Sequence, residues 1–361
     1  MLKKIFLVAG ARPNFMKIAP LIKELKKKQL DYKLIHTGQH YDYEMSKIFF
    51  DDLGIPEPDI YLNIGSASHA VQTAKIMIEF EKVLLNESPR LVIVVGDVNS
   101  TLACSLVAKK LNIKIAHVES GLRSFDQKMP EEINRILTDQ LSDFLFITEP
   151  SAEVNLLKEG IDQSKIFFVG NIMIDTLLLN LERAKNLNII AQYDLKEKEY
   201  ALMTIHRPSN VDNIESLNKI INYIQERIKI FFPIHPRTTK RLQEFNLDKK
   251  LLKSNLILSE PIGYLEFLNL MVNSKFILTD SGGIQEEASY LHIPILTIRE
   301  NTERPITIEK GTNEIVGTNL ELIKKYVDEM LMNEYKNGQN IEKWDGKTAE
   351  RIVNIIQEKL G

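Results

Sequence analysis

Charged and glycine residues directly follow several short apolar runs in this 361-residue sequence. The clearest case is the segment 279–288, which follows the apolar run 276–278 and leads into a predicted helix ending near Leu291. Two glycines there let the backbone turn tightly, so unpaired N–H groups at the positive end of the helix would form an anion cradle. Glu287, one turn further in, could accept hydrogen bonds from a sugar attached to that anion. The alternative is an ordinary strand-to-helix turn with a polar cap, because short motifs often arise by chance.

Two cations follow the first apolar run, 5–9. Arg12 comes directly after Gly10-Ala11, and Lys17 lies one helical turn further along. Both could bind a diphosphate, because arginine offers a bidentate fork and lysine a point charge. The alternative is that both are solvated cations on the surface of a helix. Without further motifs, this alternative is the better interpretation.

A carboxylate, Asp97, follows the apolar run 91–95. It could cap the next helix or take part in chemistry. Asn99, Ser100 and Thr101 can supply that cap. We therefore weigh a functional and a structural role for Asp97 about equally.

Glu119 lies at the mouth of another predicted strand, 113–118, and the alternation of a strand puts it on the same side as His117. A glutamate at a strand mouth without a local partner is costly, which favours a functional role. His117 fits equally well as a core histidine whose ring nitrogens are both hydrogen bonded.

Two glutamates, Glu131 and Glu132, open a predicted helix that begins at Pro130. Proline suits the first helical turn and acidic side chains suit the helix dipole. Local structure alone therefore explains both glutamates without any chemistry.

Two His/Arg pairs lie at predicted strand ends in the second half of the chain, His206-Arg207 and His235-Pro236-Arg237. Opposite a Gly-Gly turn, such pairs are typical of a diphosphate pocket. The histidines lack metal-ligand spacing and the sequence has no Cys/His cluster, so we predict no zinc site.

These side chains need a scaffold that gathers strand ends, and the sequence predicts one. Val- and Ile-rich runs alternate with helical patterns, which indicates mostly parallel sheets covered on both faces. A polar, lysine-rich segment at 186–199 interrupts the alternation, which then restarts. We predict an α/β protein with two doubly wound domains facing each other, 1–170 and 171–345, and with ligands in the cleft between them. A C-terminal helix at 346–361 is expected to cross back to the first domain. The predicted strands are 5–9, 32–37, 91–95, 113–118, 144–148, 166–169, 201–205, 229–234, 256–259, 276–279 and 294–298.

The composition limits the classes of partner. A formal net charge of −3 gives no general attraction to nucleic acid or anionic membranes, so an anion site must be local. Cys104, the only cysteine, lies in an apolar helical pattern and fits a buried structural thiol. The N-terminal apolar run is too short for a signal peptide, and no window is long and apolar enough to span a membrane. We expect a cytoplasmic protein.

Taken together, the motifs resemble the UDP-N-acetylglucosamine 2-epimerases of the non-hydrolysing type over essentially the whole length. Any one motif is weak evidence, whereas eight in the same order are strong. They are GARP at 10–13 with KIAP at 17–20, TGQH at 37–40, VGDVNST at 95–101, HVESGLRS at 117–124, PEEINR at 130–135, HR at 206–207, LTDSGGIQEEA at 278–288 and TERP at 302–305.

This resemblance implies a glycosyltransferase-B-like fold with two Rossmann-like domains, a homodimer, and no cofactor. It implies interconversion of UDP-GlcNAc and UDP-ManNAc, the latter feeding surface-polysaccharide synthesis. The implied substrate-binding residues are Arg12, Lys17, Phe267 (against the uracil), Ser281, Gly282, Gly283, Glu287 and Arg304. The implied catalytic residues are Asp97, Glu119, Glu131 and His206.

The chemistry of such a reaction gives each catalytic residue a role. The proton on carbon two is not acidified by a carbonyl, so the expected route eliminates UDP to give 2-acetamidoglucal and then adds UDP back. Proton transfer is then needed on both faces of carbon two, which suits Asp97 and Glu119. Glu131 would tune or share one transfer, and His206 would stabilise the leaving diphosphate. The sequence leaves open which carboxylate serves which face.

Two departures from bacterial relatives stand out. A glutamate usually follows their His-Arg pair, whereas Pro208-Ser209-Asn210 follows it here, and the segment 65–72 lacks their Gln-rich allosteric pattern. The sequence therefore leaves open whether UDP-GlcNAc activates the protein allosterically. Rival functions are a hydrolysing epimerase, for which the VNST run after Asp97 is atypical, a glycosyltransferase of the same fold, and a non-catalytic nucleotide-sugar sensor.

Overall fold

The computed structural model describes residues 4–39, 50, 52–207, 210, 214–234 and 255–360. His40, His235 and Arg237, which the sequence motifs include, lie outside these residues. The chain divides into two compact units, one formed by Met1–Leu179 with Glu342–Gly361 and the other by Asn180–Ile341. In this division, residues 171–179 and 342–345 belong to the first unit. The domain limits given above, 1–170, 171–345 and 346–361, stay a prediction.

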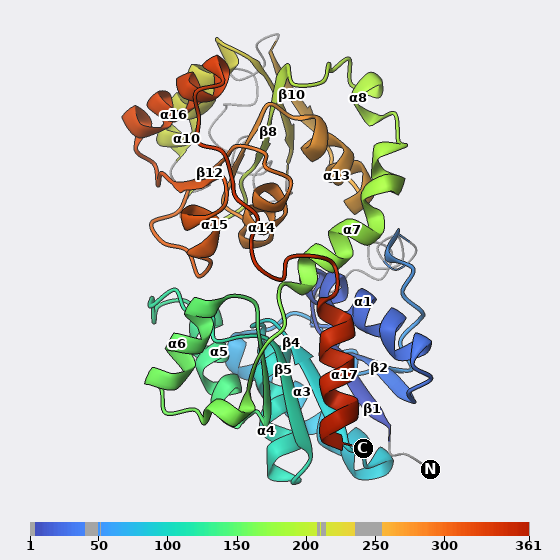
Figure 1. The fold of residues 1–361 in the computed structure, drawn as a ribbon. Helices are drawn as coiled ribbons and strands as arrows, with labels where there is room; N and C mark the ends of the chain where they lie inside the picture. The colour runs from blue at the N-terminus through green and yellow to red at the C-terminus, as the bar shows by residue number, and fades with distance from the viewer. Residues whose placement is uncertain are drawn as a thin grey trace. The chain divides into compact units, whose positions relative to one another are not determined.

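The first unit is built on a parallel sheet, in which Figure 1 labels β2, β1, β4 and β5. The full strand order is β3-β2-β1-β4-β5-β6-β7 among the described residues. The strands are added outward in one direction from β1 to β3 and in the other from β4 to β7. This is the arrangement of a doubly wound, Rossmann-like domain. The strands are β1 Ile5–Ala9, β2 Tyr32–His36, β3 Ile60–Tyr61, β4 Leu91–Val95, β5 Lys114–Ser120, β6 Phe144–Ile147 and β7 Ile166–Phe168. The helices are α1 Arg12–Lys27, α3 His69–Glu87, α4 Asn99–Lys110, α5 Pro130–Leu141, α6 Pro150–Lys158 and α17 Thr348–Leu360, while α7 Ile172–Lys185 continues into the second unit.

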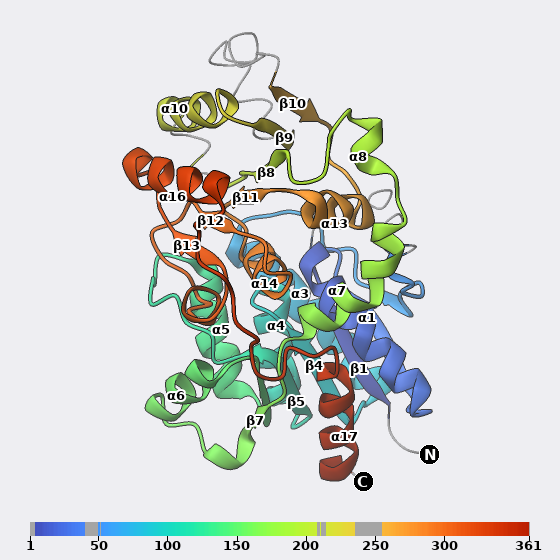
Figure 2. The same cartoon turned by 45° about the horizontal axis from the view of Figure 1, so that its top comes forward.

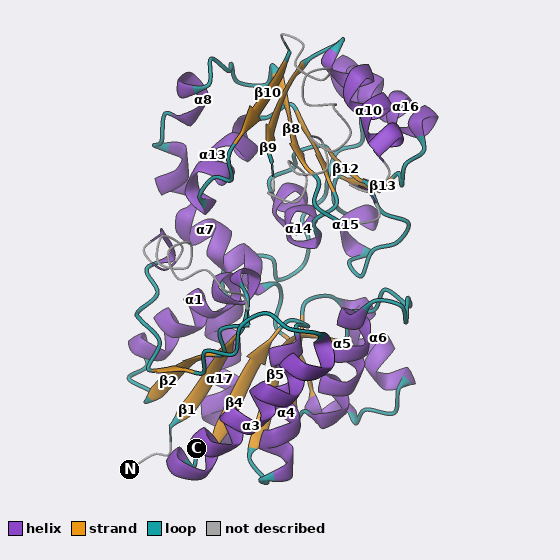
Figure 3. Ribbon diagram, turned by 180° about the vertical axis from the view of Figure 1, so that it is seen from behind, coloured by secondary structure: helices purple, strands orange, loops and turns teal. Residues whose placement is uncertain are grey.

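Helices cover both faces of this sheet, so its central strands β1 and β4 are apolar and buried throughout. On one face α3, α4 and α5 lie side by side (Figure 3). Their apolar side chains pack with alternate residues of the strands, such as Phe6 and Val8 of β1, into one buried cluster. On the other face α17 packs against α1. The buried Asp175 of α7 accepts hydrogen bonds from the N–H groups of Thr348 and Ala349 and thereby caps α17.

The second unit repeats the design, with the parallel order β10-β9-β8-β11-β12-β13 among its described residues, visible strand by strand in Figure 2. Its strands are β8 Tyr200–Thr204, β9 Lys229–Pro233, β10 Leu256–Ser259, β11 Phe276–Thr279, β12 Ile295–Thr297 and β13 Asn313–Ile315. Its helices are α8 Ile189–Gln192, α10 Ile214–Gln225, α13 Tyr264–Asn273, α14 Gly282–Tyr290, α15 Ile306–Glu309 and α16 Leu320–Met332. The prediction of two doubly wound parallel α/β units is confirmed. No helix in the described part of the chain is long and apolar enough to cross a membrane.

Candidate active site

In the first unit, the loop after β1 is fastened to the end of β4 by one side chain. Asn14 Oδ1 accepts hydrogen bonds from the N–H groups of Gly10 and Ala11, each at 3.0 Å, and its Nδ2 donates to the Val95 carbonyl at 3.0 Å. This fixes where α1 begins, with Arg12 exposed in its first turn. The same helix carries Lys17 on its buried side.

Lys17 and Glu119 form a buried ion pair. The Lys17 Nζ lies 2.6 Å from Glu119 Oε2, and both side chains are almost fully enclosed. The backbone of Glu119 has a φ of 72°, which is in the left-handed region. The residue lies where the register between β5 and β6 shifts. Such a backbone costs on the order of 1–3 kcal/mol for a residue other than glycine and persists where its surroundings hold it. Glu119 thus has no local partner, as expected, but a distant one: Lys17 is 102 residues away in sequence, which the strand pattern cannot show.

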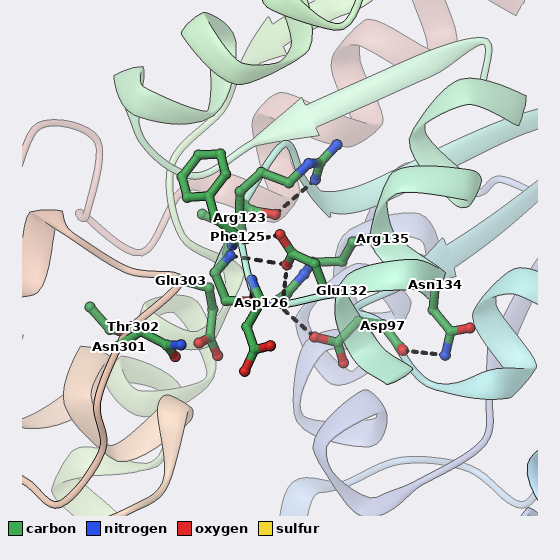
Figure 4. Close-up of polar contacts among 12 residues, drawn as sticks. Asp97, Arg123, Phe125, Asp126, Glu132, Asn134, Arg135, Asn301, Thr302 and Glu303 are labelled. Atoms are coloured by element: carbon green, nitrogen blue, oxygen red, sulfur yellow. Dashed lines mark hydrogen bonds and ion pairs between the residues drawn. The ribbon is translucent and has the colours of Figure 1, made fainter. Parts of the chain in front are cut away.

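Asp97 is held at both its backbone and its carboxylate by α5 (Figure 4). Asn134 Nδ2 donates to the Asp97 carbonyl at 2.9 Å, and Arg135 Nη1 lies 3.2 Å from Asp97 Oδ2. The Asp97 side chain is about one-fifth exposed, at 22%. The carboxylate is thus fixed by a cation and still reachable.

Asn99, Ser100 and Thr101 do not supply the predicted cap of α4. The residue before α4 is Val98, which has no side-chain cap, and Gln39 Oε1 accepts the hydrogen bond from the Ser100 N–H instead. Asn99 Nδ2 donates to Gln72, and the Thr101 hydroxyl donates to the Val95 carbonyl. The three polar residues serve as tertiary contacts, which local sequence cannot reveal.

The two glutamates that open α5 differ sharply. Glu131 is exposed, whereas Glu132 is buried. Glu132 accepts hydrogen bonds from the N–H groups of Ser124 at 3.0 Å and Phe125 at 2.8 Å, and lies 2.8 Å from Arg135 Nη2. Arg135 therefore bridges Glu132 and Asp97, as Figure 4 shows. Sequence reasoning missed Glu132; its spacing of three from Arg135 on a helix is the signal that could have indicated it.

His117 is fully buried, as expected for a core histidine. Its Nδ1 lies 2.7 Å from Asp139 Oδ1, and its Nε2 lies 2.8 Å from the Gly96 carbonyl oxygen. Burial opposes ionisation of Asp139, but the charges and hydrogen bonds of His117 and Arg123 outweigh it and lower the pKa of that carboxyl. The sequence singled out none of these contacts.

In the second unit, the predicted glycine turn forms the start of α14. Its N-cap, Ser281, makes no side-chain cap, and Gly282 and Gly283 form the first turn. A Cβ on Gly282 would lie 2.8 Å from Arg304 Nη1, so only glycine lets the guanidinium come this close. Arg304 is in turn held by Glu286, with its Nε 2.9 Å from Glu286 Oε1, and by Glu303. Helix N–H groups beside a fixed arginine can bind a diphosphate.

Glu287 lies one turn further along α14 and is buried. The Tyr264 hydroxyl donates to Glu287 Oε1 at 2.7 Å. Burial raises the pKa of Glu287 to about 7, Tyr264 opposes this rise, and the neighbouring Glu286 charge adds to it. Phe267, on the same helix as Tyr264, is half-buried.

His206 follows β8 and is organised by Asp280, which follows the neighbouring β11. His206 Nδ1 lies 2.8 Å from Asp280 Oδ1, and the N–H groups of His206 and Arg207 both donate to this carboxylate. Asn210 Nδ2 donates to it at 3.0 Å. Burial would raise the pKa of Asp280, but His206 and the other donors outweigh burial and lower it. Asp280 is a second site residue that sequence reasoning did not assign.

Each unit therefore gathers its predicted residues at the carboxyl ends of its own strands. The first unit brings together Lys17, Asp97, Glu119 and α5, and the second brings together His206, the α14 turn and Arg304. Among the described residues, no group of three His, Cys, Asp or Glu is arranged to hold a metal ion.

Comparison with known proteins agrees with this arrangement. A family model described as UDP-N-acetylglucosamine 2-epimerase matches residues 23–357. The chain is 51% identical to the UDP-N-acetylglucosamine 2-epimerase of Methanocaldococcus jannaschii, covering 98% of each protein. It is 41% identical to the UDP-2,3-diacetamido-2,3-dideoxy-D-glucuronate 2-epimerase of Pseudomonas aeruginosa, covering 89% of this chain and 90% of that one. The crystal structure of the M. jannaschii enzyme in complex with UDP-GlcNAc and UDP superimposes with a TM-score of 0.88 at 50% identity, covering 98% of this chain and 99% of that one.

Proposed function

Because the chain belongs to the UDP-N-acetylglucosamine 2-epimerase family, we propose that it is an enzyme that interconverts UDP-GlcNAc and UDP-ManNAc without hydrolysing them. The observation that carries this proposal is the pair of carboxylates at the ends of adjacent strands. Asp97 follows β4, Glu119 is the second-last residue of β5, and each is paired with its own buried cation. Two carboxylates on adjacent strands, each held by a different cation, suit a reaction that moves a proton on and off two faces of one carbon.

In the proposed reaction, one carboxylate removes the proton from carbon two while the bond from carbon one to the diphosphate oxygen breaks. This elimination gives 2-acetamidoglucal and UDP. The other carboxylate then delivers a proton to the opposite face of carbon two as UDP returns to carbon one. Glu131 would tune or share one of these transfers.

The second unit would hold the diphosphate as negative charge develops on it. The N–H groups at the start of α14, from Ser281 to Gly283, and the Arg304 guanidinium suit an anion whose charge grows in the transition state. His206, with its Nδ1 on Asp280, would present its other ring nitrogen to the same group. Arg12 and Lys17 would add positive charge, Glu287 would bind the ribose, and Phe267 would lie against the uracil.

We further propose that the protein is a cytoplasmic homodimer and that its product, UDP-ManNAc, is used in surface-polysaccharide synthesis. Val71, Ile78 and Leu85 are spaced by seven residues on α3 and are all exposed, as are Ile133 and Leu137 of α5. A hollow of about 420 Å³ lies between these helices, lined by Ala70, Ala74, Met77 and Ile133 among others. Exposed apolar stripes of this kind favour association with a second copy.

A related sugar is the second candidate substrate. The relative named UDP-2,3-diacetamido-2,3-dideoxy-D-glucuronate 2-epimerase is 41% identical to this chain. Inversion at carbon two would be common to both substrates, while the groups on carbons three and five differ. Parallel assays with both nucleotide sugars separate the candidates.

Incubation of the purified protein with UDP-GlcNAc in heavy water, followed by proton NMR and mass analysis, tests the proposal. UDP-ManNAc carrying deuterium at carbon two supports it. Free N-acetylmannosamine with UDP would make the protein a hydrolysing enzyme. Unchanged, undeuterated UDP-GlcNAc would contradict the proposal for this substrate and direct the search to other donors, to acceptors or to a sensor role.

A further inference from the structure

A fully buried charge cluster adjoins the ends of β4 and β5, and the reaction proposed above does not use it. The cluster consists of His117, Asp139 and Arg123, with 0%, 0% and 3% of their surfaces exposed. Buried charges are expensive unless paired, so their contacts show what the cluster holds in place.

Asp139 holds the chain that follows β5. Its Oδ2 accepts hydrogen bonds from the Gly121 N–H at 3.1 Å and from Arg123 Nη2 at 2.7 Å. Gly121 comes two residues after Glu119, whose φ of 72 is a conformation that needs outside support. Gly121 itself is tightly enclosed, because a Cβ there would lie 2.6 Å from the Ala152 carbonyl oxygen.

Asp139 also holds the chain that follows β4, through His117. The His117 Nδ1 lies 2.7 Å from Asp139 Oδ1, and its Nε2 lies 2.8 Å from the Gly96 carbonyl oxygen. The two ring nitrogens thus connect the Asp139 carboxylate to the Gly96 carbonyl. Gly96 directly precedes Asp97, and thus the carboxylate of Asp139 is linked to the backbone next to both candidate acid/base residues.

The position of Asp139 on α5 strengthens this link. Arg135 and Asp139 are four residues apart and lie on one face of the helix. Arg135 contacts the Asp97 carboxylate, and Asn134 donates to the Asp97 carbonyl. The α5 helix therefore fixes Asp97 directly through two side chains and fixes its neighbour Gly96 through a third.

We propose that Asp139 is a positioning residue that keeps Asp97 and Glu119 at the separation needed for proton transfer on both faces of one carbon. This inference rests on the proposed epimerase function. Asp139 touches neither reacting atoms nor substrate and acts through His117 and Gly121. Displacing a catalytic group by about 1 Å can cost about a hundredfold in rate, so its removal should be felt in turnover.

The test compares Asp139→Ala with Asp139→Asn. Asparagine can donate to His117 Nδ1, leaving Nε2–H on the Gly96 carbonyl, while its oxygen accepts from Gly121. Alanine breaks both links. We expect Asp139→Ala to lower kcat about a hundredfold or more with KM and UDP affinity within about threefold, and Asp139→Asn to stay within about tenfold of the wild type.

The matched control is Glu159→Gln. Glu159 is partly exposed and accepts hydrogen bonds from Arg123 Nε at 2.8 Å and from Arg123 Nη2 at 2.7 Å. Neither bond involves Asp139. Its kcat should stay within about twofold of the wild type, because the links to Gly96 and Gly121 are intact. Thermal melts establish that each variant is folded before its kinetics are compared.

A folded Asp139→Ala enzyme with kcat within about threefold of the wild type would overturn the inference. So would a loss of UDP affinity as large as the loss of kcat, since the damage would then be general. If Asp139→Ala does not fold, His117→Gln must lower kcat at least about tenfold, and a smaller loss overturns the inference. Wild-type protein that forms no UDP-ManNAc would end the proposed function itself, whereas an active wild type with an equally active Asp139→Ala ends only this inference.

Discussion

The two units use buried charges in opposite ways. In the first unit, buried cations hold carboxylates, with Lys17 on Glu119 and Arg135 on Asp97. In the second unit, buried carboxylates hold donors, with Glu286 and Glu303 on the Arg304 cation and Asp280 on the His206 ring. The first arrangement presents groups that can move protons, and the second presents groups that can bind an anion. One doubly wound scaffold therefore supports two kinds of chemistry, and the sign of the held group decides which.

The largest effect should come from removing a held carboxylate. Asp97→Asn and Glu119→Gln are each expected to lower turnover by about 10²–10⁴-fold, because a general acid or base contributes about that much. UDP affinity should change little if the second unit binds the diphosphate. Steady-state kinetics and UDP titration measure both. Glu81→Gln, at an exposed position on α3, is the charge-matched control and should change neither.

In the second unit, displacing Arg304 should weaken UDP binding, whereas the carboxylate variants of the first unit should lose turnover. A Cβ in Gly282→Ala would lie 2.8 Å from Arg304 Nη1 and 3.0 Å from Glu303 Oε1. Overpacking of this kind costs about 1–3 kcal/mol. If this cost falls on the bound state, UDP binding should weaken by about 5- to 150-fold, as 1.4 kcal/mol corresponds to a factor of ten. Unchanged UDP affinity in calorimetry would count against a diphosphate site at the start of α14.

The adjacent glutamates of α5 separate catalysis from structure within the first unit. Glu131→Gln should leave the melting temperature unchanged, because Glu131 is exposed, and should lower turnover if Glu131 shares a proton transfer. Glu132→Gln removes the charge that faces Arg135 and weakens the support of the 124–125 backbone. It should lower the free energy of unfolding by about 1–3 kcal/mol. The reverse pattern in melts and kinetics would show that the roles are exchanged.

The smallest expected effect is on the pH dependence of the unfolding free energy, and it comes from Glu287, whose charged form is disfavoured by burial. The pKa of Glu287 is raised from 4.5 to about 7, so its stabilising contribution is fully present below pH 4.5 and is lost as the pH rises through 7. Between pH 6 and 8 the wild type should lose about 1 kcal/mol more unfolding free energy than Glu287→Gln. Denaturant titration at both pH values measures this difference. Parallel pH profiles of the two proteins would show that Glu287 has no raised pKa.

Much of the fold could be predicted from the sequence, because each long strand is a distinct apolar run between helical patterns. The strands β3 and β13 escaped prediction. β3, Ile60–Tyr61, has only two residues, and β13, Asn313–Ile315, has two polar residues among its three, so neither forms an apolar run that a pattern could reveal. Their place at the sheet edges comes from tertiary packing.

The candidate site was predictable in its location and not in its pairings. The rule that polar residues after parallel strands gather at one edge located Asp97, Glu119 and His206. Their partners Lys17, Arg135 and Asp280 are distant in sequence, and Glu132 and Asp139 look like ordinary helix residues. Pairings of this kind depend on the register of the folded sheet and on the turn of α5, which a linear pattern does not encode.

The most direct test of the central claim asks whether Asp97 and Glu119 serve opposite faces of carbon two. Asp97→Asn and Glu119→Gln are each incubated in heavy water with UDP-GlcNAc and, separately, with UDP-ManNAc. One variant should exchange the carbon-two proton of UDP-GlcNAc without forming UDP-ManNAc, and the other should exchange that of UDP-ManNAc without forming UDP-GlcNAc. Epimerisation at the wild-type rate in either variant, or exchange lost from both sugars in both variants while UDP still binds, would contradict one carboxylate per face.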